Sequence, residues 1–327
     1  MIAANQQDTS ILAERKASGS KVIPFTIPEP IVGISILIPV FNYDARKLVS
    51  YLHEYYTDKR LDLEIICCDD GSSQFVKENQ TLNNLEFCTY YKSKKNRGRS
   101  QTRNFLAQKA SKDYLLFLDC DVLPKNVSFL QRYFNAISQG KEVVFGGLEY
   151  TPSIGKEQTL RWLFGIYREA FPLEQRILKP YEATLTSNLL IKKNIFKKVL
   201  FEESLTAYGY EDFVFVQNLQ KRGIEIHQIA NETYHLNVDK SEDYIEKVRT
   251  ATRNLVYLYH TEILSEPTKI IKVYNKLKRL GLPVFLKWFY QIFRKRMEKN
   301  LISRKPSLTI LDIYKASYFC YHIAKKP

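Results

Sequence analysis

Short apolar runs alternate with amphipathic segments over the first half of the chain. The runs are rich in β-branched and aromatic residues and have the length of buried strands. Segments between them carry apolar residues at helical spacing. Strands that alternate with helices predict a mostly parallel sheet with helices on its faces, so the chain is expected to be an α/β protein. The strand-like runs are 34–42, 63–70, 85–92, 114–121 and 142–150, and the helical segments are about 45–57, 100–110 and 125–139, the last entered through Pro124.

The pattern is less regular after residue 150. A long helical segment is nevertheless clear at 241–264. Before it we expect a strand with a following turn in 186–196, a loop running into a helix that stops at Gly223, and strands in 224–238. These elements divide the chain into an irregular lead-in (1–33), a sheet domain (34–240), a helix packed on that domain (241–267) and a basic amphipathic helical extension (268–327).

Composition narrows the classes of protein to consider. Five cysteines without CxxC spacing indicate reduced thiols and argue against a zinc site. The first residues contain no apolar core of a signal peptide, and no window of 18 apolar residues predicts a membrane-spanning helix. We therefore expect a cytoplasmic protein that can lie peripherally on the inner face of the cell membrane.

Almost all of the net charge lies at the C-terminal end. Residues 268–327 contain fifteen Lys and Arg and two acids, a net charge of +13, whereas the rest of the chain has 34 basic and 33 acidic residues. Such a field attracts anionic lipid, polyanionic glycan or nucleic acid. Pro283 divides this region into two helical pieces, and an apolar stripe follows it beside basic residues, as in an interfacial amphipathic helix. The stripe is Val284, Phe285, Trp288, Phe289 and Ile292. The alternative is a helical subdomain packed on the core with a solvated basic face; nucleic acid is the least favoured partner.

Asp119-Cys120-Asp121 closes the apolar run YLLFLDCD. Because alternate strand residues point to one face, the two carboxylates are expected to share a side while Cys120 points the other way. Such a pair suits a hard divalent cation, Mg²⁺ or Mn²⁺, that carries a nucleotide diphosphate. A simple turn at the strand end is the alternative.

Other candidate residues follow strands or open helices. Asp70, in DDGSS, can form a turn or bind a base or ribose. The basic segment 96–104 opens a helix, where amides and guanidinium groups suit an anion such as diphosphate, or it is merely solvated. Ser187 and Asn188 can bind sugar hydroxyls or satisfy backbone groups.

A second acidic pair, Glu211-Asp212, opens a later helix. Acids in a first turn are ordinary partners of the helix dipole. The functional alternative makes Asp212 a general base that deprotonates a hydroxyl. His235 is either structural or completes a metal shell begun by Asp121.

Six segments taken together resemble family 2 glycosyltransferases, which have the GT-A fold and use nucleotide sugars. They occur in the family's order over about residues 34–237: ISILIPVFN, IICCDDGSS, NRGRSQTRN, LFLDCD, TSNLLIKK and YGYEDFVF. The last segment, with the later His235, also resembles the carboxyl-terminal half of galactosyltransferase-type enzymes. The resemblance makes 34–240 a nucleotide-sugar-binding catalytic domain.

The resemblance also implies a role for each matching residue. On the nucleotide side, Pro39 and Phe41 would line the base pocket, Asp70 would bind uracil or ribose, Arg103 would reach the base, and Asp119 would face the ribose. On the sugar side, Asp121 and His235 would hold Mn²⁺ or Mg²⁺ with the diphosphate, Asp212 would be the catalytic base, and Glu211 would bind a sugar hydroxyl of donor or acceptor.

Two departures limit the resemblance. Tyr208-Gly209-Tyr210 stands where many relatives carry Gly-Gly or Trp-Gly. The QxxRW motif of membrane-embedded polymerising relatives is not completed at Arg161-Trp162, so processive synthesis coupled to export is not expected.

The prediction is therefore an inverting, metal-dependent glycosyltransferase. It would move a sugar from a nucleotide donor, expected to be UDP-linked, to a glycan or lipid-linked glycan in surface polysaccharide biosynthesis. One alternative, a nucleotidyltransferase, usually has a Gly-rich loop where this chain has PVFNYDARK. The other, a non-enzymatic basic protein that binds membrane or nucleic acid, explains the basic tail but not the acids at the strand ends.

Overall fold

A mixed sheet forms the centre of the computed structural model, which describes residues 32–54, 61–152 and 155–324. Nearly all of the predicted lead-in, up to residue 31, lies outside the described residues. The first four strands pair in parallel, and β8 joins β4 and β6 in antiparallel fashion. The strand order is β3 (Cys88–Lys92), β2 (Leu63–Asp69), β1 (Ile34–Val40), β4 (Tyr114–Leu118), β8 (Asn188–Lys192), β6 (Val143–Phe145) and β9 (His227–Gln228).

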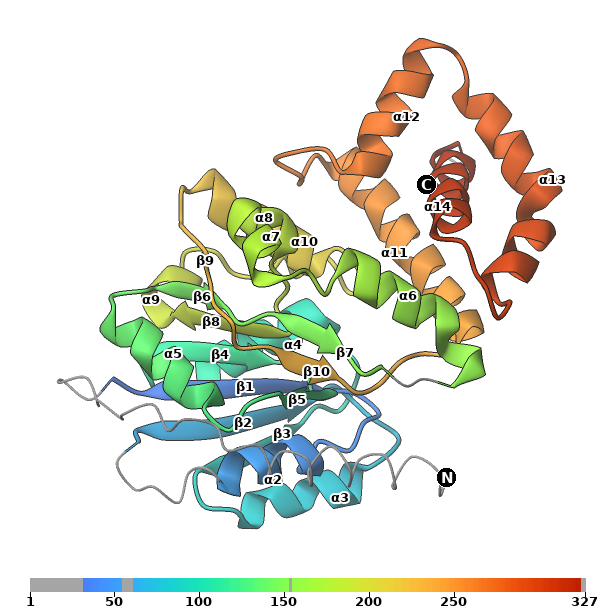
Figure 1. Ribbon diagram of the computed structural model, residues 1–327. Coiled ribbons are helices and arrows are strands. Elements are labelled where there is room, and N and C mark those ends of the chain that lie inside the picture. The colour runs from blue at the N-terminus through green and yellow to red at the C-terminus, as the bar shows by residue number, and fades with distance from the viewer. Residues whose placement is uncertain (1–31, 55–60, 153–154, 325–327) are drawn as a thin grey trace.

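Helices cover both faces of this sheet (Figure 1), as the sequence pattern predicts. Along β1 the side chains alternate between two cores: Ile36 and Ile38 pack in one, and Leu37 packs in the other. The first core includes residues of α2 (Arg46–Glu54), η2 (Thr81–Asn84) and α5 (Phe129–Ser138); α3 (Val76–Gln80) directly precedes η2. The second includes residues of α4 (Arg99–Lys109), α9 (Lys193–Phe196) and α10 (Glu211–Lys221).

The single strand predicted at 142–150 is wrong, because the chain divides there into two strands of different sheets. Gly147 has φ +97°, which disfavours any other residue. A Cβ at Gly146 would lie 2.5 Å from the side chains of Tyr133 and Asn188. The glycines thus let the chain leave β6 and enter a small second sheet, whose order is β5 (Val122–Pro124), β10 (Thr233–His235) and β7 (Leu148–Tyr150). Since 122–124 form β5, the helix predicted from 125 begins only at Phe129.

The strand order reverses beside β1, because β2 lies on one side of it and β4 on the other. In open α/β sheets the crevice at such a point, outside the carboxyl ends of the strands, is where ligands bind. The turn after β4 carries Asp119–Asp121 into this crevice.

Four C-terminal helices form a bundle beside the sheet domain (Figure 1). The helix predicted at 241–264 is α11 (Ser241–Thr261), which is followed by α12 (Lys269–Arg279), α13 (Pro283–Leu301) and α14 (Leu308–Ile323). The bundle core also takes in Leu160 of α6 (Thr159–Arg168), which follows η3 (Lys156–Gln158) and precedes α7 (Leu173–Leu178) and α8 (Pro180–Ala183). Among the described residues, no helix has both the length and the hydropathy needed to cross a bilayer.

One side of α13 packs in the bundle and the other is exposed. Tyr290 and Met297 are buried, whereas Trp288 is 63% exposed. One member of the predicted apolar stripe, Phe289, does not belong to the exposed side of the helix. It is half-buried against the bundle core, and its ring centroid lies 4.7 Å from that of Phe293. The exposed residues of the stripe are Val284, Phe285, Trp288 and Ile292.

Candidate active site

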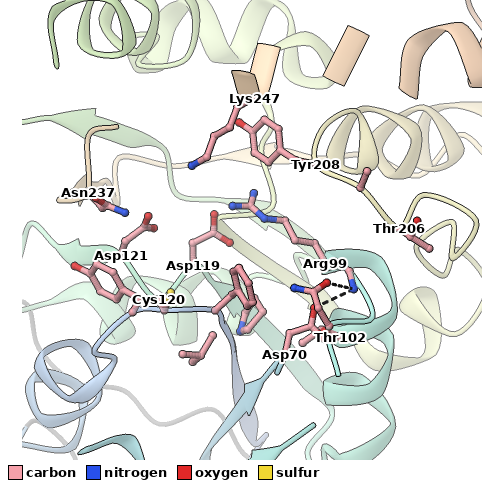
Figure 2. Close-up of a pocket in the computed structure, with 17 residues that line it drawn as sticks. Asp70, Arg99, Thr102, Asp119, Cys120, Asp121, Thr206, Tyr208, Asn237 and Lys247 are labelled. Carbon is pink, nitrogen blue, oxygen red and sulfur yellow. Dashed lines mark hydrogen bonds between the residues drawn. The ribbon is translucent and has the colours of Figure 1, made fainter. Parts of the chain in front are cut away.

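Asp119, Cys120 and Asp121 lie in a turn, because β4 ends at Leu118. The backbone N–H of Val122 donates to the carbonyl of Asp119 and closes the turn. Strand alternation therefore stops before the acidic pair. The expectation that Cys120 points away is wrong: it lines the same cavity as both acids (Figure 2).

This cavity of about 300 Å³, which we call the Phe41 cavity, lies at the carboxyl ends of β1, β2 and β4. Four of the five residues predicted for the nucleotide line it: Pro39, Phe41, Asp70 and Asp119. The ring of Phe41 is 51% exposed, which leaves a face open to a flat partner such as a base.

Asp70 ties the basic loop before α4 to the end of β2. Its Oδ1 accepts from the backbone N–H of Arg97 at 2.8 Å, and its Oδ2 accepts from that of Gly98 at 2.9 Å. Burial raises the pKa of this carboxyl, while the two amides favour its ionised form. Gly98 is required here, since φ is +89° and a Cβ would lie 2.4 Å from the carbonyl oxygen of Thr206. The tie fixes where α4 begins and hence where its arginines project.

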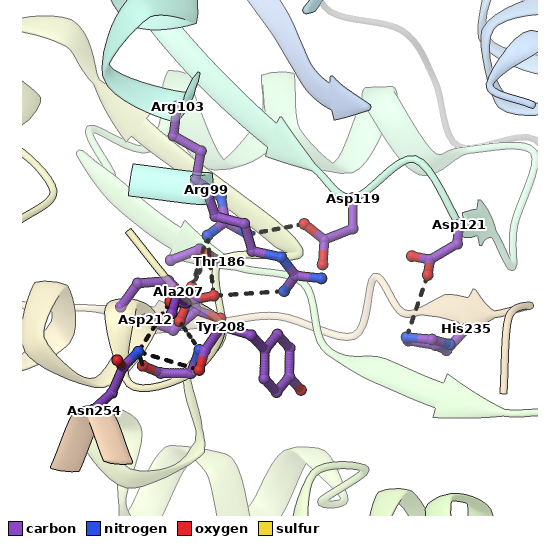
Figure 3. Close-up of polar contacts among 12 residues, drawn as sticks. Arg99, Arg103, Asp119, Asp121, Thr186, Ala207, Tyr208, Asp212, His235 and Asn254 are labelled. Carbon is purple, nitrogen blue, oxygen red and sulfur yellow. Dashed lines mark hydrogen bonds and ion pairs between the residues drawn. The ribbon is translucent and has the colours of Figure 1, made fainter. Parts of the chain in front are cut away.

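Arg103 does not line the Phe41 cavity, so its predicted contact with the base is corrected. Its side chain is 1% exposed and lies behind the acids. One guanidinium nitrogen donates to Oδ1 of Asp119 at 2.9 Å and another to Oδ1 of Asp212 at 3.0 Å (Figure 3). Burial by itself would raise the pKa of Asp119, but Arg103 and Arg99 lower it below its ordinary value.

Asp212 lies in the first turn of α10, and only one oxygen of its carboxylate accepts hydrogen bonds from described residues. Both hydrogen bonds to its carboxylate, from Arg103 and from the hydroxyl of Thr186, end on Oδ1. Within the described parts of the chain, nothing donates to Oδ2. The carboxylate is thus oriented through one oxygen while the other is free to accept a proton.

Glu211 is buried next to Asp212, with its Oε2 accepting from the backbone N–H of Gly209 at 2.9 Å. Burial, then the neighbouring charge of Asp212, raises the pKa of this carboxyl. Its Oε1 lies 3.5 Å from the guanidinium of Arg99. It therefore faces a cation of the site, and its predicted contact with a sugar hydroxyl stays a prediction.

Ser187 and Asn188 differ in what they offer a ligand. The hydroxyl of Ser187 is buried, has no hydrogen-bond partner in the described structure, and lines a second, small cavity of about 90 Å³. Asn188 is fully buried; its amide donates to the carbonyls of Gly147 and Asn231 and accepts from Tyr133. The hydrogen bonds of the Asn188 amide are therefore made within the fold, and its predicted contact with sugar is wrong. Ser187 remains a candidate for that contact.

Asp121 and His235 also line this second cavity, which we call the Ser187 cavity. The Nε2 of His235 lies 3.8 Å from Oδ2 of Asp121 (Figure 3), and Nδ1 of the same ring is a buried atom without a partner. No group of three potential metal-binding His, Cys, Asp or Glu side chains exists in the described part of the chain. The two residues fit a divalent ion that takes its remaining ligands from diphosphate and water, because one offers a carboxylate oxygen and the other an imidazole nitrogen.

Two cations that face these cavities complete the site. Arg99, in the basic segment expected to bind an anion, lines both cavities, and Lys247 of α11 does so too. Lys247 also pairs with Asp239 at 2.7 Å. No pattern in the sequence distinguishes Lys247 from the many other charged residues of this helix.

A third cavity of about 320 Å³, which we call the Phe164 cavity, adjoins the other two. Arg99 and Tyr208 line all three, and Asp212 lines the second and third. The ring of Tyr208 lies under the guanidinium of Arg99, 5.0 Å away. Sequence patterns did not point to Thr186, Tyr208 or Glu169, which reach the site from separate segments. The three cavities are therefore neighbours, and Asp212 lies between the second and the third.

Comparisons with known proteins agree with this geometry. The family model described as "Glycosyl transferase family 2" matches residues 35–200. No curated protein matches the chain. A mannosyltransferase, PcManGT from Pyrobaculum calidifontis, solved with GDP-Man and Mn²⁺, is 13% identical; the match covers 99% of this chain and 98% of that one, with a TM-score of 0.53. This likeness supports a GT-A fold.

Two structures of S. aureus TarS are also similar. One, TarS, is 20% identical over 68% of this chain, with a TM-score of 0.48, and the match spans only 40% of its own length. TarS 1-349 in complex with UDP-GlcNAc is 16% identical, with 90% of this chain and 91% of that one covered and a TM-score of 0.49.

Proposed function

Since the chain belongs to glycosyl transferase family 2, we propose that it is an inverting, metal-dependent enzyme that transfers a sugar from a UDP donor to a hydroxyl of a glycan or lipid-linked glycan. Transfer from a nucleotide-sugar donor is the activity of the family and its GT-A relatives. The observation that carries the proposal is the position of Asp212, which lines both the Ser187 cavity and the Phe164 cavity. A base at that point separates a donor side from an acceptor side.

The donor's nucleotide would lie in the Phe41 cavity. The exposed ring of Phe41 offers a face to the base, and the ionised Asp119 at the cavity floor can accept from ribose hydroxyls. The sugar would then lie in the Ser187 cavity, where the unpaired hydroxyl of Ser187 provides a hydrogen-bond partner. This order places the bond to be broken between the two cavities.

Asp121 and His235 would hold Mn²⁺ or Mg²⁺, which when bound would neutralise charge on the departing diphosphate. The chain contributes its own positive groups to the same task. Arg99 and Lys247 line the junction of the two cavities, where the negative charge develops. Cations that the fold already holds in position stabilise such charge without reorganising during the reaction.

Asp212 would act as the base. Arg103 and Thr186 fix its Oδ1, so Oδ2 can receive the proton of an acceptor hydroxyl in the Phe164 cavity. As the proton leaves, that oxygen attacks the anomeric carbon and the bond to the diphosphate breaks. Attack from the side opposite the leaving group inverts the anomeric configuration.

The test is a screen of nucleotide sugars with Mn²⁺, Mg²⁺ or EDTA, read by mass spectrometry of products and by thermal stabilisation. We expect UDP with Mn²⁺ to raise the melting temperature and one UDP-sugar to be consumed only when metal is present. A protein that neither binds any nucleoside diphosphate nor consumes any nucleotide sugar would refute the function.

We further propose that α13 docks on an anionic membrane surface, which suits a lipid-linked acceptor in surface polysaccharide assembly. Its exposed apolar residues, 284, 285, 288 and 292, fall within an arc of about 100° at helical spacing. Lys295 and Arg296, one turn further along, are exposed beside them. Charge complementarity favours anionic lipid as the occupant, since each basic residue near such a leaflet contributes about 1 kcal/mol. A peripheral position on the inner face of the membrane stays a prediction.

A further inference from the structure

The Phe164 cavity is bounded partly by the C-terminal bundle. Its walls come from α6, α8, α10 and α11, from Arg99 of α4, from loop residues that include Tyr208, and from a single residue of α14, Lys315. The extension that carries most of the net charge thus reaches the same cavity as Asp212. A residue of α14 is therefore in place to contact whatever lies beside the base.

Aromatic rings make up much of the remaining wall. Phe164, Tyr181, Tyr210, Phe213 and Tyr244 all line the cavity. Ligand sites of this size are commonly lined by apolar and aromatic side chains, with a few polar groups that fix orientation. Such a wall suits the apolar faces of sugar rings, so the polar groups in it should report the acceptor's chemistry.

Lys315 is the polar group that lacks a function in the fold. Its ammonium group makes no hydrogen bond or ion pair with any described residue. It lies 5.2 Å from the centroid of the Phe164 ring. Burial lowers the pKa of this ammonium group below its ordinary value. The ring of Phe164 attracts the ammonium group but does not neutralise its charge. A partly buried charge without a counter-ion is costly to a fold, which favours an anionic partner that is not in the chain.

The acids near Lys315 are already engaged. Asp312 pairs with Arg168 at 2.9 Å, and Glu169 pairs with Arg161 at 3.0 Å. Neither carboxylate lies within ion-pair distance of Lys315. Lys315 therefore has no carboxylate partner among the described residues. The other acids that line the cavity are Glu182, Glu211 and Asp212, and none of them forms an ion pair with it.

We propose that the Phe164 cavity binds an acceptor glycan that carries an anionic group, and that this group is recognised by Lys315. The inference rests on the proposed function, because it takes Asp212 as the base beside the acceptor. The anionic group can be the carboxylate of an acidic sugar or a phosphate ester, since both offer oxygens to an ammonium group. The aromatic wall holds the sugar rings while Lys315 sets which acceptors enter.

The test compares three glycosides on the same apolar aglycone: a neutral hexoside, the matching uronide and the matching sugar phosphate. Binding is measured by calorimetry with UDP and Mn²⁺ present, and transfer is measured with the preferred UDP-sugar. We expect one anionic glycoside to bind at least tenfold more tightly than the neutral one, as for one charge-assisted hydrogen bond. The preferred glycoside shows whether the anionic group of the acceptor is a carboxylate or a phosphate ester.

Lys315→Met removes the charge and keeps most of the length. We expect it to raise KM for the anionic acceptor about tenfold, with little change in kcat and none in hydrolysis of the UDP-sugar without acceptor. Lys315→Arg should restore most of the affinity. Lys221→Met is the matched control, because Lys221 is an exposed lysine at the far end of α10. The melting temperature of each variant separates loss of folding from loss of binding.

Three results would overturn the inference. They are equal affinity for neutral and anionic glycosides, no binding of either anionic glycoside, and an unchanged KM in Lys315→Met. Each of these leaves the transferase standing if the UDP-sugar is still hydrolysed with Mn²⁺. Failure of that hydrolysis in the wild-type protein would instead count against the proposed function itself.

Discussion

Arg103 donates a 3.0 Å hydrogen bond to Oδ1 of Asp212, although the two residues are 109 positions apart. The same guanidinium also binds Asp119, so one buried cation links the helix that carries the expected base to the turn that carries the acidic pair. Since Arg103 is 1% exposed, neither water nor nucleotide can take the place of these partners. Its role is to position acids, and this relationship yields the first expectation.

Arg103→Met should lower the free energy of unfolding as well as the transferase activity. Two carboxylates in the site would lose their cation, and breaking a buried pair by removing one partner costs roughly 3 kcal/mol or more. Urea unfolding measures the loss. Arg46→Met is the control, because Arg46 pairs with Asp44 at an exposed site where such pairs contribute about 0–1 kcal/mol. Equal effects of the two substitutions would contradict the structural role of Arg103.

Asp212→Asn should lower kcat by about 10²–10⁴-fold, because the amide cannot take the acceptor's proton. UDP affinity with Mn²⁺ should remain close to wild type, since Asp212 does not line the Phe41 cavity. Steady-state kinetics and calorimetry together check both statements. Asp113→Asn serves as the control, because Asp113 is an exposed acid at the opposite end of β4. Wild-type turnover in Asp212→Asn would remove this residue from the role of base.

Substitution of either expected metal ligand should weaken UDP binding only when metal is present. We expect Asp121→Asn and His235→Ala each to weaken UDP binding at least tenfold in Mn²⁺, because each variant loses one of two protein ligands. In EDTA, all three proteins should bind UDP with the same low affinity. Calorimetry under both conditions gives the comparison. An affinity that falls equally with and without metal would mean that these residues bind the nucleotide directly.

The exposed side of α13 should bind anionic vesicles. Replacing both Phe285 and Trp288 with Ser should weaken flotation with phosphatidylserine-containing liposomes at least tenfold, since each large apolar side chain contributes about 1.5–3 kcal/mol when buried. Leu178→Ser is the control, as Leu178 is 80% exposed on α7, outside the bundle. If the wild-type protein does not float with anionic vesicles, or binds neutral vesicles equally well, this surface is excluded as the docking site.

The amino-acid sequence by itself determined the family, the α/β class and most of the strands and helices. The segments that identify the family are continuous, and the family model matches residues 35–200, which contain the first five of the six apart from Ile34. The apolar runs of β1, β2 and β4 are buried as predicted. A continuous apolar run of strand length indicates by itself a strand that is buried on both faces. The acids after β2 and β4 could be placed at one sheet edge for the same reason.

Only the tertiary structure decided what individual side chains face. Strand β4 ends at Leu118, three residues earlier than expected, and the turn that follows brings Cys120 into the cavity. Gly146 and Gly147 divide one apolar run between two sheets. Arg103 and Asn188 have the residue types of ligand-binding groups, yet their partners in the fold occupy them. Lys247 and Lys315 look like ordinary surface lysines in sequence, yet they line cavities of the site. Polar chemistry depends on which groups lie within about 4 Å, and packing between distant elements sets those distances.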